Sequence, residues 1–424
     1  MLDETVMQEL DFEKIYQTFP DMCISLEIQT GKVVDCNETL TKVLGYTKEE
    51  VLSSSLFDLY HDSQHDKVVN NLTYIKEGKP PPHSEYIVET KLGELIDVML
   101  KVEFVKDDNG AILYTNAVWR DITEIKKMRK EILNEKERIA AEKRIIEEKN
   151  KDFRDAIHYA KNIQQSILPT QQEIDYVLPN SSVFYRPKGI VSGDFYWLYQ
   201  KDDQVLFAVI DCTGHGVPGA LMSMIGGTLL NQIAVEKKLF CTEQIMDEMR
   251  LGVIKALHQD GEERKNSDGM DACFCIYDKS LNQIEFTGAN NSLVIIRSIK
   301  EPLIDSRGIQ YEANQINEFH SLYQIKGERN PIGYHDGNRT KFNKKKFNLQ
   351  SGDYIHLFSD GFQDQIGGPK GKKYLSKKFK QLLLANAETE VQSITQVFSD
   401  ELESWQGASY EQTYDICIWS LKID

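Results

Sequence analysis

Hydrophobic and polar positions follow three different patterns along this chain of 424 residues. Over residues 1–120, short runs that alternate apolar and polar positions are separated by turn residues, which predicts strands joined by hairpins. Over residues 121–168 there is no Gly or Pro, and helix-forming residues dominate. Over residues 175–424, apolar runs of five or six residues alternate with helical segments. The pattern therefore predicts two folded domains joined by one long helix, with an α+β fold class.

The long helix has a heptad repeat in which the a positions are apolar throughout, whereas the d positions are apolar only in part. Its a positions are Ile125, Ile132, Ile139, Ile146, Phe153, Ala160 and Ile167, whereas the d positions are apolar at both ends and charged in the middle. One interpretation is a coiled-coil signalling helix whose pairing can shift at low cost, and the other is a solvated linker helix. Under either interpretation we expect a homodimer, because a single helix would leave its Ile stripe exposed.

Aspartates stand beside apolar, strand-like runs at four places in the second domain. Asp194 and Asp211 belong to two consecutive runs, Asp360 follows the run 354–358, and Asp415 precedes the run 416–419. Each aspartate taken singly is best explained as a turn residue. All four together favour a site for hard divalent cations such as Mg²⁺ or Mn²⁺, which prefer oxygen ligands and offset the repulsion between carboxylates.

Five short motifs follow one another through this domain: Ser192-Gly193-Asp194-Phe195-Tyr196, Asp211-Cys212-Thr213-Gly214-His215-Gly216, Gly288-Ala289-Asn290-Asn291, Asn330-Pro331-Ile332-Gly333 and Ser359-Asp360-Gly361. As an ordered set they resemble the motifs of the SpoIIE-type serine phosphatases, which belong to the metal-dependent PPM (type 2C) phosphatases. The resemblance extends from about Ile163 to the C-terminus. It implies an αββα sandwich of two antiparallel sheets covered by helices.

The resemblance also implies a chemistry. Two Mn²⁺ or Mg²⁺ ions would activate water for in-line attack on a phosphoserine or phosphothreonine, with no covalent enzyme intermediate. Asp211 would contact both ions, the backbone carbonyl of Cys212 would help to hold one of them, Asp360 would bind the first ion and Asp194 would reach the second.

Two further residues have both a functional and a structural interpretation. His215 is the candidate general acid for the leaving serine oxygen, since imidazole holds a proton near neutral pH, or it is a turn histidine between two glycines. Arg186 is a candidate for bidentate phosphate binding or a surface ion-pair residue.

The sequence departs from the family pattern at one position near its C-terminus. The family usually has two adjacent aspartates there, and this chain has Tyr414-Asp415. Tyr414 replaces the aspartate that we align with a metal ligand, and a neutral phenol is a poor ligand for Mg²⁺ or Mn²⁺. Either Asp415 takes over as the metal ligand, or the first metal is weakly held, or the enzyme is crippled. Alternation along a strand would turn Asp415 to the opposite face from Tyr414, so this replacement is not automatic.

The first domain resembles a PAS domain, over roughly residues 10–125. The resemblance rests on the order of the predicted elements, on Cys36-Asn37-Glu38-Thr39-Leu40, on Leu44-Gly45-Tyr46-Thr47 and on the closing Trp119-Arg120-Asp121-Ile122-Thr123. No ligand for this domain follows from the sequence. His61, His65 and His83 could ligate haem, but their polar neighbours favour solvated loop histidines.

Composition narrows the classes of function. A formal net charge of −16 argues against a general nucleic-acid-binding protein. Seven scattered cysteines suit free thiols in a reducing cytosol. No apolar stretch approaches the roughly 20 residues of a membrane helix, and the acidic N-terminus lacks a signal-peptide pattern, so we expect a cytoplasmic protein without a membrane span.

The sequence thus predicts a PAS-like sensor domain at 1–120, a coiled-coil helix at 121–168 and a PPM phosphatase domain at 175–424. By family resemblance, the substrate is a phosphoserine or phosphothreonine protein such as an anti-sigma-factor antagonist. One alternative is a catalytically dead module that binds phosphoproteins, which Tyr414 supports. Another is a sensor histidine kinase using His158, and the absence of ATP-site motifs downstream argues against it.

Overall fold

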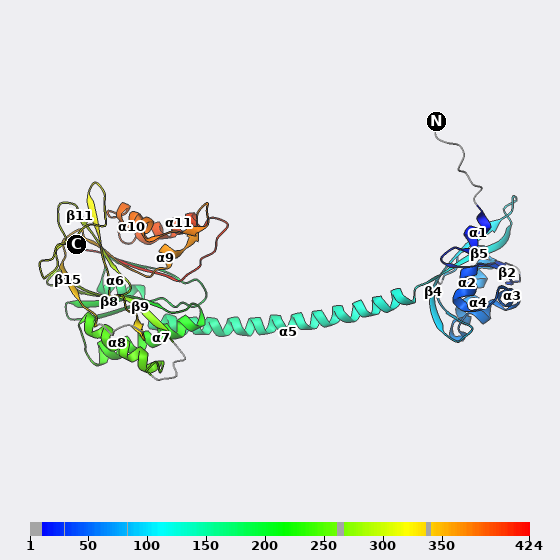
Figure 1. The fold of residues 1–424 in the computed structure, drawn as a ribbon, viewed down its shortest axis with the longest axis horizontal. Helices are drawn as coiled ribbons and strands as arrows, with labels where there is room; N and C mark the ends of the chain where they lie inside the picture. The colour runs from blue at the N-terminus through cyan, green and yellow to red at the C-terminus, as the bar shows by residue number, and fades with distance from the viewer. Residues whose placement is uncertain (1–10, 29, 83, 261–266, 336–340) are drawn as a thin grey trace, which may run out of the picture. The chain divides into compact units, whose positions relative to one another are not determined.

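The computed structural model describes residues 11–28, 30–82, 84–260, 267–335 and 341–424. The chain divides into two compact units, Met1–Glu148 and Lys149–Asp424 (Figure 1). None of the helices in the described ranges combines the length and the apolar character that a bilayer crossing requires.

The first unit is built on a five-stranded antiparallel sheet in the order β2-β1-β5-β4-β3. Its strands are β1 (Met22–Glu27), β2 (Val33–Cys36), β3 (Glu85–Glu89), β4 (Leu95–Lys106) and β5 (Ile112–Asp121). The strands predicted over residues 1–120 are present, and β1 and β2 pair as an antiparallel hairpin. One face of the sheet packs on a core that contains Trp119, Tyr60 and Tyr86.

The helices of the first unit are α1 (Phe12–Gln17), α2 (Glu38–Leu44), α3 (Lys48–Ser53) and α4 (His65–Lys76), with short 3₁₀ turns at Leu56–Leu59 and Asp62–Gln64. The sequence did not predict α4, and His65 begins this helix instead of lying in a loop. Its Nε2 lies 3.1 Å from the carbonyl oxygen of Phe57, and His61 Nδ1 lies 2.8 Å from Ser63 Oγ. Both rings are thus engaged by local hydrogen bonds, and His83 lies outside the described residues.

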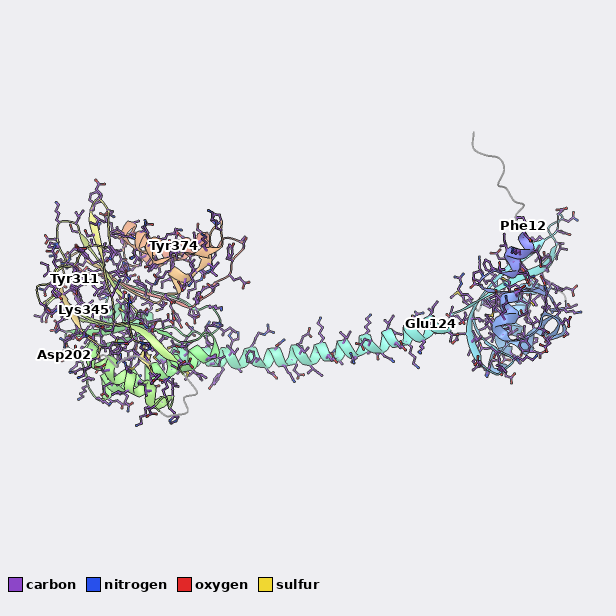
Figure 2. All side chains as sticks on the ribbon, viewed as in Figure 1. Phe12, Glu124, Asp202, Tyr311, Lys345 and Tyr374 are labelled. Carbon is purple, nitrogen blue, oxygen red and sulfur yellow. The ribbon has the colours of Figure 1, made fainter. Side chains whose placement is uncertain are left out.

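Helix α5 (Thr123–Ile167) is continuous over 45 residues, as the absence of Gly and Pro predicted. Side chains project from it on all sides, and residues 127–156 are all exposed (Figure 2). The first five predicted a positions, from Ile125 to Phe153, form an uncovered apolar stripe, with Ile132 66% and Phe153 63% exposed.

The second unit contains two antiparallel sheets. The first has the order β15-β10-β9-β8-β7, with β14 also paired to β9; its strands are β7 (Phe195–Lys201), β8 (Gln204–Cys212), β9 (Gly269–Asp278), β10 (Gln283–Ala289), β14 (Ile332–Gly333) and β15 (Lys345–Asn348). The second has the order β12-β13-β11-β16-β19-β6; its strands are β6 (Ser181–Arg186), β11 (Leu293–Ser298), β12 (Gln315–Ile316), β13 (His320–Ile325), β16 (Tyr354–Phe358) and β19 (Ile416–Lys422). A small hairpin, β17 (Ile366–Gly367) with β18 (Lys372–Lys373), lies outside both sheets.

Helices cover the outer faces of the two sheets (Figure 1). The helices are α6 (Gln171–Val177), α7 (Val217–Leu230) with a π-helical extension (Asn231–Glu236), α8 (Thr242–Ala256), α9 (Gly361–Asp364), α10 (Ser376–Ala385) and α11 (Ile394–Gln406). Helices α7 and α8 pack on the first sheet, and α10 and α11 pack on the second. The unit is therefore a four-layer αββα sandwich, which confirms the predicted fold class.

The burial of β8 explains why its sequence is apolar at consecutive positions. Leu206 and Ala208 face the helices α7 and α8, whereas Phe207 and Val209 face the second sheet. A strand that is covered on both faces has no solvent side, so the alternation of polar and apolar residues disappears.

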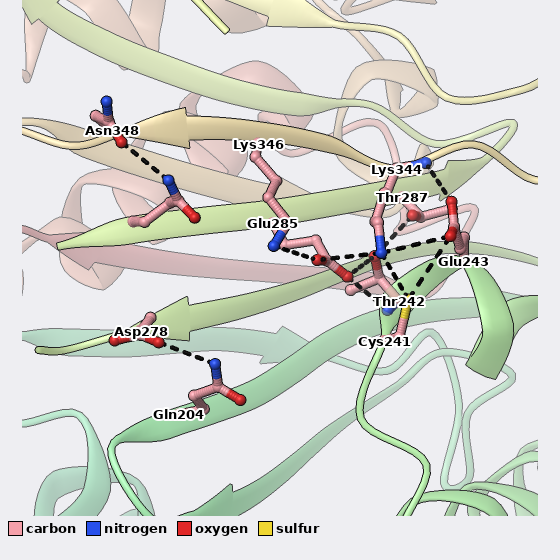
Figure 3. A network of polar contacts seen from close by, with 11 residues as sticks. Gln204, Cys241, Thr242, Glu243, Asp278, Glu285, Thr287, Lys344, Lys346 and Asn348 are labelled. Carbon is pink, nitrogen blue, oxygen red and sulfur yellow. Dashed lines mark hydrogen bonds and ion pairs between the residues drawn. The ribbon is translucent and has the colours of Figure 1, made fainter. Parts of the chain in front are cut away.

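A polar network fixes the start of α8 against the first sheet (Figure 3). The helix begins without a side-chain cap of its own. Glu285 of β10 instead accepts hydrogen bonds from the backbone N–H and the hydroxyl of Thr242, at 2.8 and 2.9 Å. The charge of Glu285 is balanced by Lys346 at 3.2 Å, and a carboxylate at a helix N-terminus is favourable. The network holds α8 and, through the first sheet, the strand β8 in place.

Candidate active site

The four aspartates that the sequence singled out lie around one cavity of about 360 Å³ in the second unit. Asp194 immediately precedes β7, Asp211 is the penultimate residue of β8, Asp360 follows β16, and Asp415 precedes β19. The cavity is lined by Asp194, Asp211, Cys212, Thr213, Gly214, His215, Ser267, Gly269, Met270, Asp271, Pro331, Asp360, Tyr414 and Asp415.

Strand register explains why these residues meet. In the β7–β8 hairpin Phe195 pairs with Ile210, which places Asp194 beside Asp211 at the same end of the first sheet. In the second sheet Phe358 pairs with Ile418, so Asp360 and Asp415 leave β16 and β19 at a common end. The cavity therefore lies where strands of both sheets end.

Close backbone contacts at this end require glycine at two positions. A Cβ on Gly193 would lie 2.5 Å from the carbonyl oxygen of Gly214, so the segment before Asp194 can pack against the loop after Asp211 only without a side chain. A Cβ on Gly361 would collide with the carbonyl oxygen of Asp415. The motif glycines thus bring the aspartates together and do not only form turns.

The cluster is electrostatically unfavourable for ionised carboxylates. Burial, and then the charge of Asp360, raise the pKa of Asp211 to about 7. Burial and the neighbouring Asp211 raise the pKa of Asp194 well above its ordinary range, against the opposing effect of the Ser359 hydroxyl, which donates to Asp194 Oδ2 at 2.5 Å. Burial and the charge of Asp364 raise the pKa of Asp360. Buried carboxylates with so little compensation are typical of functional sites.

The sequence analysis missed one carboxylate of this cluster. Asp271 of β9 pairs directly with Asp211 of β8 and lines the cavity. Burial raises its pKa, while a hydrogen bond donated by Asn290 at 2.7 Å acts in the opposite direction. The signal that selected the other four was present, because Asp271 also stands at the start of an apolar run. Asn290 has φ +55°, as a turn former would, and it also orients this carboxylate.

Asp415 has a structural role that its sequence position did not suggest. Its Oδ1 accepts the backbone N–H of Lys188 at 2.7 Å, and its Oδ2 accepts that of Gly193 at 2.8 Å. Both oxygens therefore hold the segment that leads to Asp194.

The expectation that Tyr414 and Asp415 would point to opposite faces is wrong. Both residues line the cavity, because β19 begins only at Ile416 and strand alternation does not yet apply to them. Tyr414 is 40% exposed, and Lys373 of β18 lies 5.9 Å from its ring.

The basic residues lie at the edge of this acidic cavity. His215 lines it, and Lys188 Nζ lies 3.3 Å from His215 Nε2. Arg186 is not among the lining residues, and its guanidinium pairs with Glu403 at 3.4 Å. The structure thus brings His215 to the aspartates and places Arg186 in a surface ion pair. Lys188, two residues further on, is the basic residue beside His215, and the sequence analysis did not select it.

The donor set suits hard divalent cations. All the charged donors around the cavity are carboxylates, Cys212 belongs to the lining, and repulsion between buried carboxylates is what a bound cation relieves. Across the described ranges, no three His, Cys, Asp or Glu side chains are already arranged as a metal-binding cluster. The individual ligand assignments therefore stay predictions.

Comparison with known proteins identifies the class to which this fold and site belong. The model of the family described as Stage II sporulation protein E (SpoIIE) matches residues 201–424, and a PAS domain model matches residues 20–124. Among solved structures, the SiaA-PP2C domain of Pseudomonas aeruginosa is 28% identical, with a TM-score of 0.55 over 65% of this chain and 98% of that domain. The second unit is thus a PP2C-type phosphatase fold.

Two further structures are similar at lower identity. One contains the PP2C phosphatase domain and a fragment of the regulatory domain of SpoIIE from Bacillus subtilis, with 14% identity, a TM-score of 0.43, and coverage of 77% of this chain and 71% of that chain. The other contains the RsbU and RsbW domains of a protein from Mycobacterium tuberculosis, with 17% identity, a TM-score of 0.41, and coverage of 58% and 60%. No curated protein matches the chain at a significant level.

The family model covers more than half of the chain, and the chain belongs to the SpoIIE family. It joins a SpoIIE-type phosphatase fold to an N-terminal PAS domain, the combination expected of a signal-transduction phosphatase. The range matched by the family model begins at residue 201, so Asp194 lies before it. The strands on either side of Asp194, β6 and β7, nevertheless belong to the two sheets of the same fold.

Proposed function

We propose that this chain is a metal-dependent protein phosphatase that hydrolyses phosphoserine or phosphothreonine in a partner protein, under the control of its PAS domain. The observation that carries the proposal is the convergence of Asp194, Asp211, Asp271 and Asp360 on one cavity of a PP2C-type fold. Mn²⁺ or Mg²⁺ ions, two by family resemblance, would be held by Asp211, Asp360, Asp194 and the Cys212 carbonyl. When bound, they would supply an activated water and neutralise phosphoryl oxygens.

The remaining side chains of the cavity have separate tasks in this proposal. Asp271 stands beside Asp211 and adds a further carboxylate to the donor set. His215 lies at the edge of the cavity, where it can give a proton to the departing serine or threonine oxygen. Lys188, beside His215, provides positive charge for the phosphoryl group, and we place Arg186 outside the site because it pairs with Glu403. Asp415 keeps the segment before Asp194 in place through two backbone hydrogen bonds.

We further propose that the protein acts as a homodimer in the cytoplasm. The exposed a-position residues of α5 would pair with those of a second copy, which removes a stripe of apolar surface from water. All seven cysteines are unpaired, which suits a reducing compartment. SpoIIE family membership suggests a partner-switching pathway, with a phosphorylated anti-sigma-factor antagonist as substrate.

A second function is supported by Tyr414. A phenol occupies the cavity wall where the family pattern places a ligand carboxylate, and both oxygens of the adjacent Asp415 are engaged by backbone N–H groups. A chain that had lost a ligand in this way would bind a phosphoprotein without hydrolysing it.

One experiment separates the two functions. Hydrolysis of a phosphoserine peptide and of an aryl phosphate is measured during titration with Mn²⁺ and Mg²⁺, with Asp211→Asn as the inactive control. Metal-dependent turnover that disappears in Asp211→Asn supports the phosphatase. Absence of turnover that Tyr414→Asp restores supports the binding module. Absence of turnover in both the wild type and Tyr414→Asp at millimolar Mn²⁺ contradicts the proposed enzyme, provided that the unit 149–424 alone is also inactive.

A further inference from the structure

Gln164, near the end of α5, is the one fully buried side chain of this 45-residue helix. It is 3% exposed, and its amide makes three hydrogen bonds to two separate segments of the second unit. Its Nε2 donates to the carbonyl oxygen of Ser192 at 2.6 Å and lies 2.8 Å from Ser223 Oγ, while its Oε1 accepts the backbone N–H of Ser192 at 3.1 Å.

One of the two segments that Gln164 joins leads to Asp194, and the other is the helix that follows the loop after Asp211. Ser192 lies two residues before Asp194, and its hydroxyl accepts the backbone N–H of Asp194 at 3.0 Å. Ser223 lies on α7, the helix that directly follows the loop from Asp211 to Gly216. One buried amide thus fixes the position of both segments relative to each other, at the point where Gly193 and Gly219 are in close backbone contact.

Packing alone does not explain a glutamine at this position. The neighbouring buried residue Leu168 belongs to the apolar core, and Ile167 lies against α7 at Gly227, where an added Cβ would be 3.6 Å from its Cδ1. An apolar side chain of similar size would continue this core without the cost of desolvating an amide. The two hydrogen bonds between the Gln164 amide and the backbone N–H and C=O of Ser192 fix the orientation of this segment, which apolar contact alone would not fix.

We propose that Gln164 is a positioning residue of the phosphatase site. Its amide holds the Ser192–Asp194 segment and α7 at the spacing at which Asp194 and Asp211 can share divalent cations. This inference rests on the proposed function for the claim that the site binds divalent cations. The hydrogen bonds of Gln164 are observed independently of that function.

The test compares Gln164→Leu with Gln165→Leu in the full chain. Gln165 is the next residue of the same helix and is exposed, so this variant controls for the chemical change. Mn²⁺ affinity is measured by titration calorimetry, and amide hydrogen exchange is measured at Ser192 and Gly193. We expect Gln164→Leu to weaken Mn²⁺ binding about tenfold or more, as removal of outer-shell partners of metal ligands typically does, and to speed exchange at both amides. Gln165→Leu should match the wild type.

Ser223→Ala serves if Gln164→Leu does not fold. It removes one of the three hydrogen bonds and leaves the pair to Ser192, so we expect a smaller loss of Mn²⁺ affinity in the same direction. Activity on an aryl phosphate is recorded as well, and excess Mn²⁺ should restore most of kcat with little change in KM.

Two results overturn the inference: wild-type Mn²⁺ affinity in Gln164→Leu and Ser223→Ala, or wild-type exchange rates at Ser192 and Gly193 in folded Gln164→Leu. If the wild-type chain binds no Mn²⁺ at all, the proposed function fails, and the exchange rates alone decide whether Gln164 holds the segment.

Discussion

Replacing Asp211 by asparagine should stabilise the metal-free protein while it removes activity. Asp211 has a pKa raised from 3.8 to about 7, first by burial and then by the charge of Asp360. The unfolded chain releases this proton near pH 3.8, whereas the folded protein retains it up to about pH 7. The folded state thus binds more protons in this window, and its stability falls as the pH rises from about 4 to 7.

The size of the effect follows from that difference. About three pKa units correspond to roughly 4 kcal/mol above pH 7, as an upper limit for the cost of ionising Asp211. At pH 5 the cost is only about 1.7 kcal/mol, because the folded protein still holds the proton. Since 1 kcal/mol shifts the Tm of a domain of this size by about 2–4 °C, Asp211→Asn should melt several degrees above the wild type at pH 8 and gain much less at pH 5.

Thermal unfolding of the wild type and of Asp211→Asn is followed by circular dichroism in the presence of a chelator. The difference between their Tm values is measured at pH 5 and at pH 8. Asp203→Asn, a change at an exposed turn residue, controls for the loss of one negative charge. Added Mn²⁺ should reverse the order at pH 8, because the wild type gains a bound cation and the variant gains less. A variant that is no more stable than the wild type at pH 8 in chelator, or whose gain is the same at both pH values, would refute the electrostatic argument.

Three further predictions concern other parts of the chain. His356 is fully buried, and burial lowers its pKa from 6.5 to about 3. The unfolded chain therefore binds this proton more readily, and the folded state loses stability as the pH falls below 6.5. His356→Gln should remove about 2 kcal/mol of the destabilisation that urea titrations measure between pH 7 and pH 5. Ile139→Lys places a charge in the stripe of α5 and should lower the dimer fraction in sedimentation equilibrium, whereas Ala141→Lys, outside the stripe, should not; an unchanged dimer would rule out pairing through this stripe. Gly361→Ala should destabilise the second unit by about 1–3 kcal/mol and reduce activity, since its Cβ would collide with the Asp415 carbonyl; wild-type melting and turnover would show that the contact adapts.

Much of the fold was predictable because local patterns carry it. The strand β8, which is buried on both faces, was predicted from its uninterrupted apolar run. Helix α5 was predicted from 45 residues without a helix breaker. Helix α4 was not predicted because its many polar residues, among them Asn70 and Asn71, obscure the helical spacing of the buried Val68 and Ile75 in the sequence.

The ordered motifs grouped Asp194, Asp211 and Asp360, the apolar run 416–419 singled out Asp415, and the structure places all four around one cavity. What only the tertiary structure decided are relations between strands and segments distant in sequence. Asp271 joins the cluster through the register of β8 and β9, a pairing across about 60 residues. Lys188 reaches His215, and Gln164 reaches Ser192 and Ser223, by packing of elements whose sequences carry no mark of the contact. Asp415 stands just before β19, and its carboxylate is oriented by the backbone N–H groups of Lys188 and Gly193, which belong to a segment more than 200 residues earlier. A sequence specifies the local periodicity of each element, whereas the assembly of a site depends on where those elements meet.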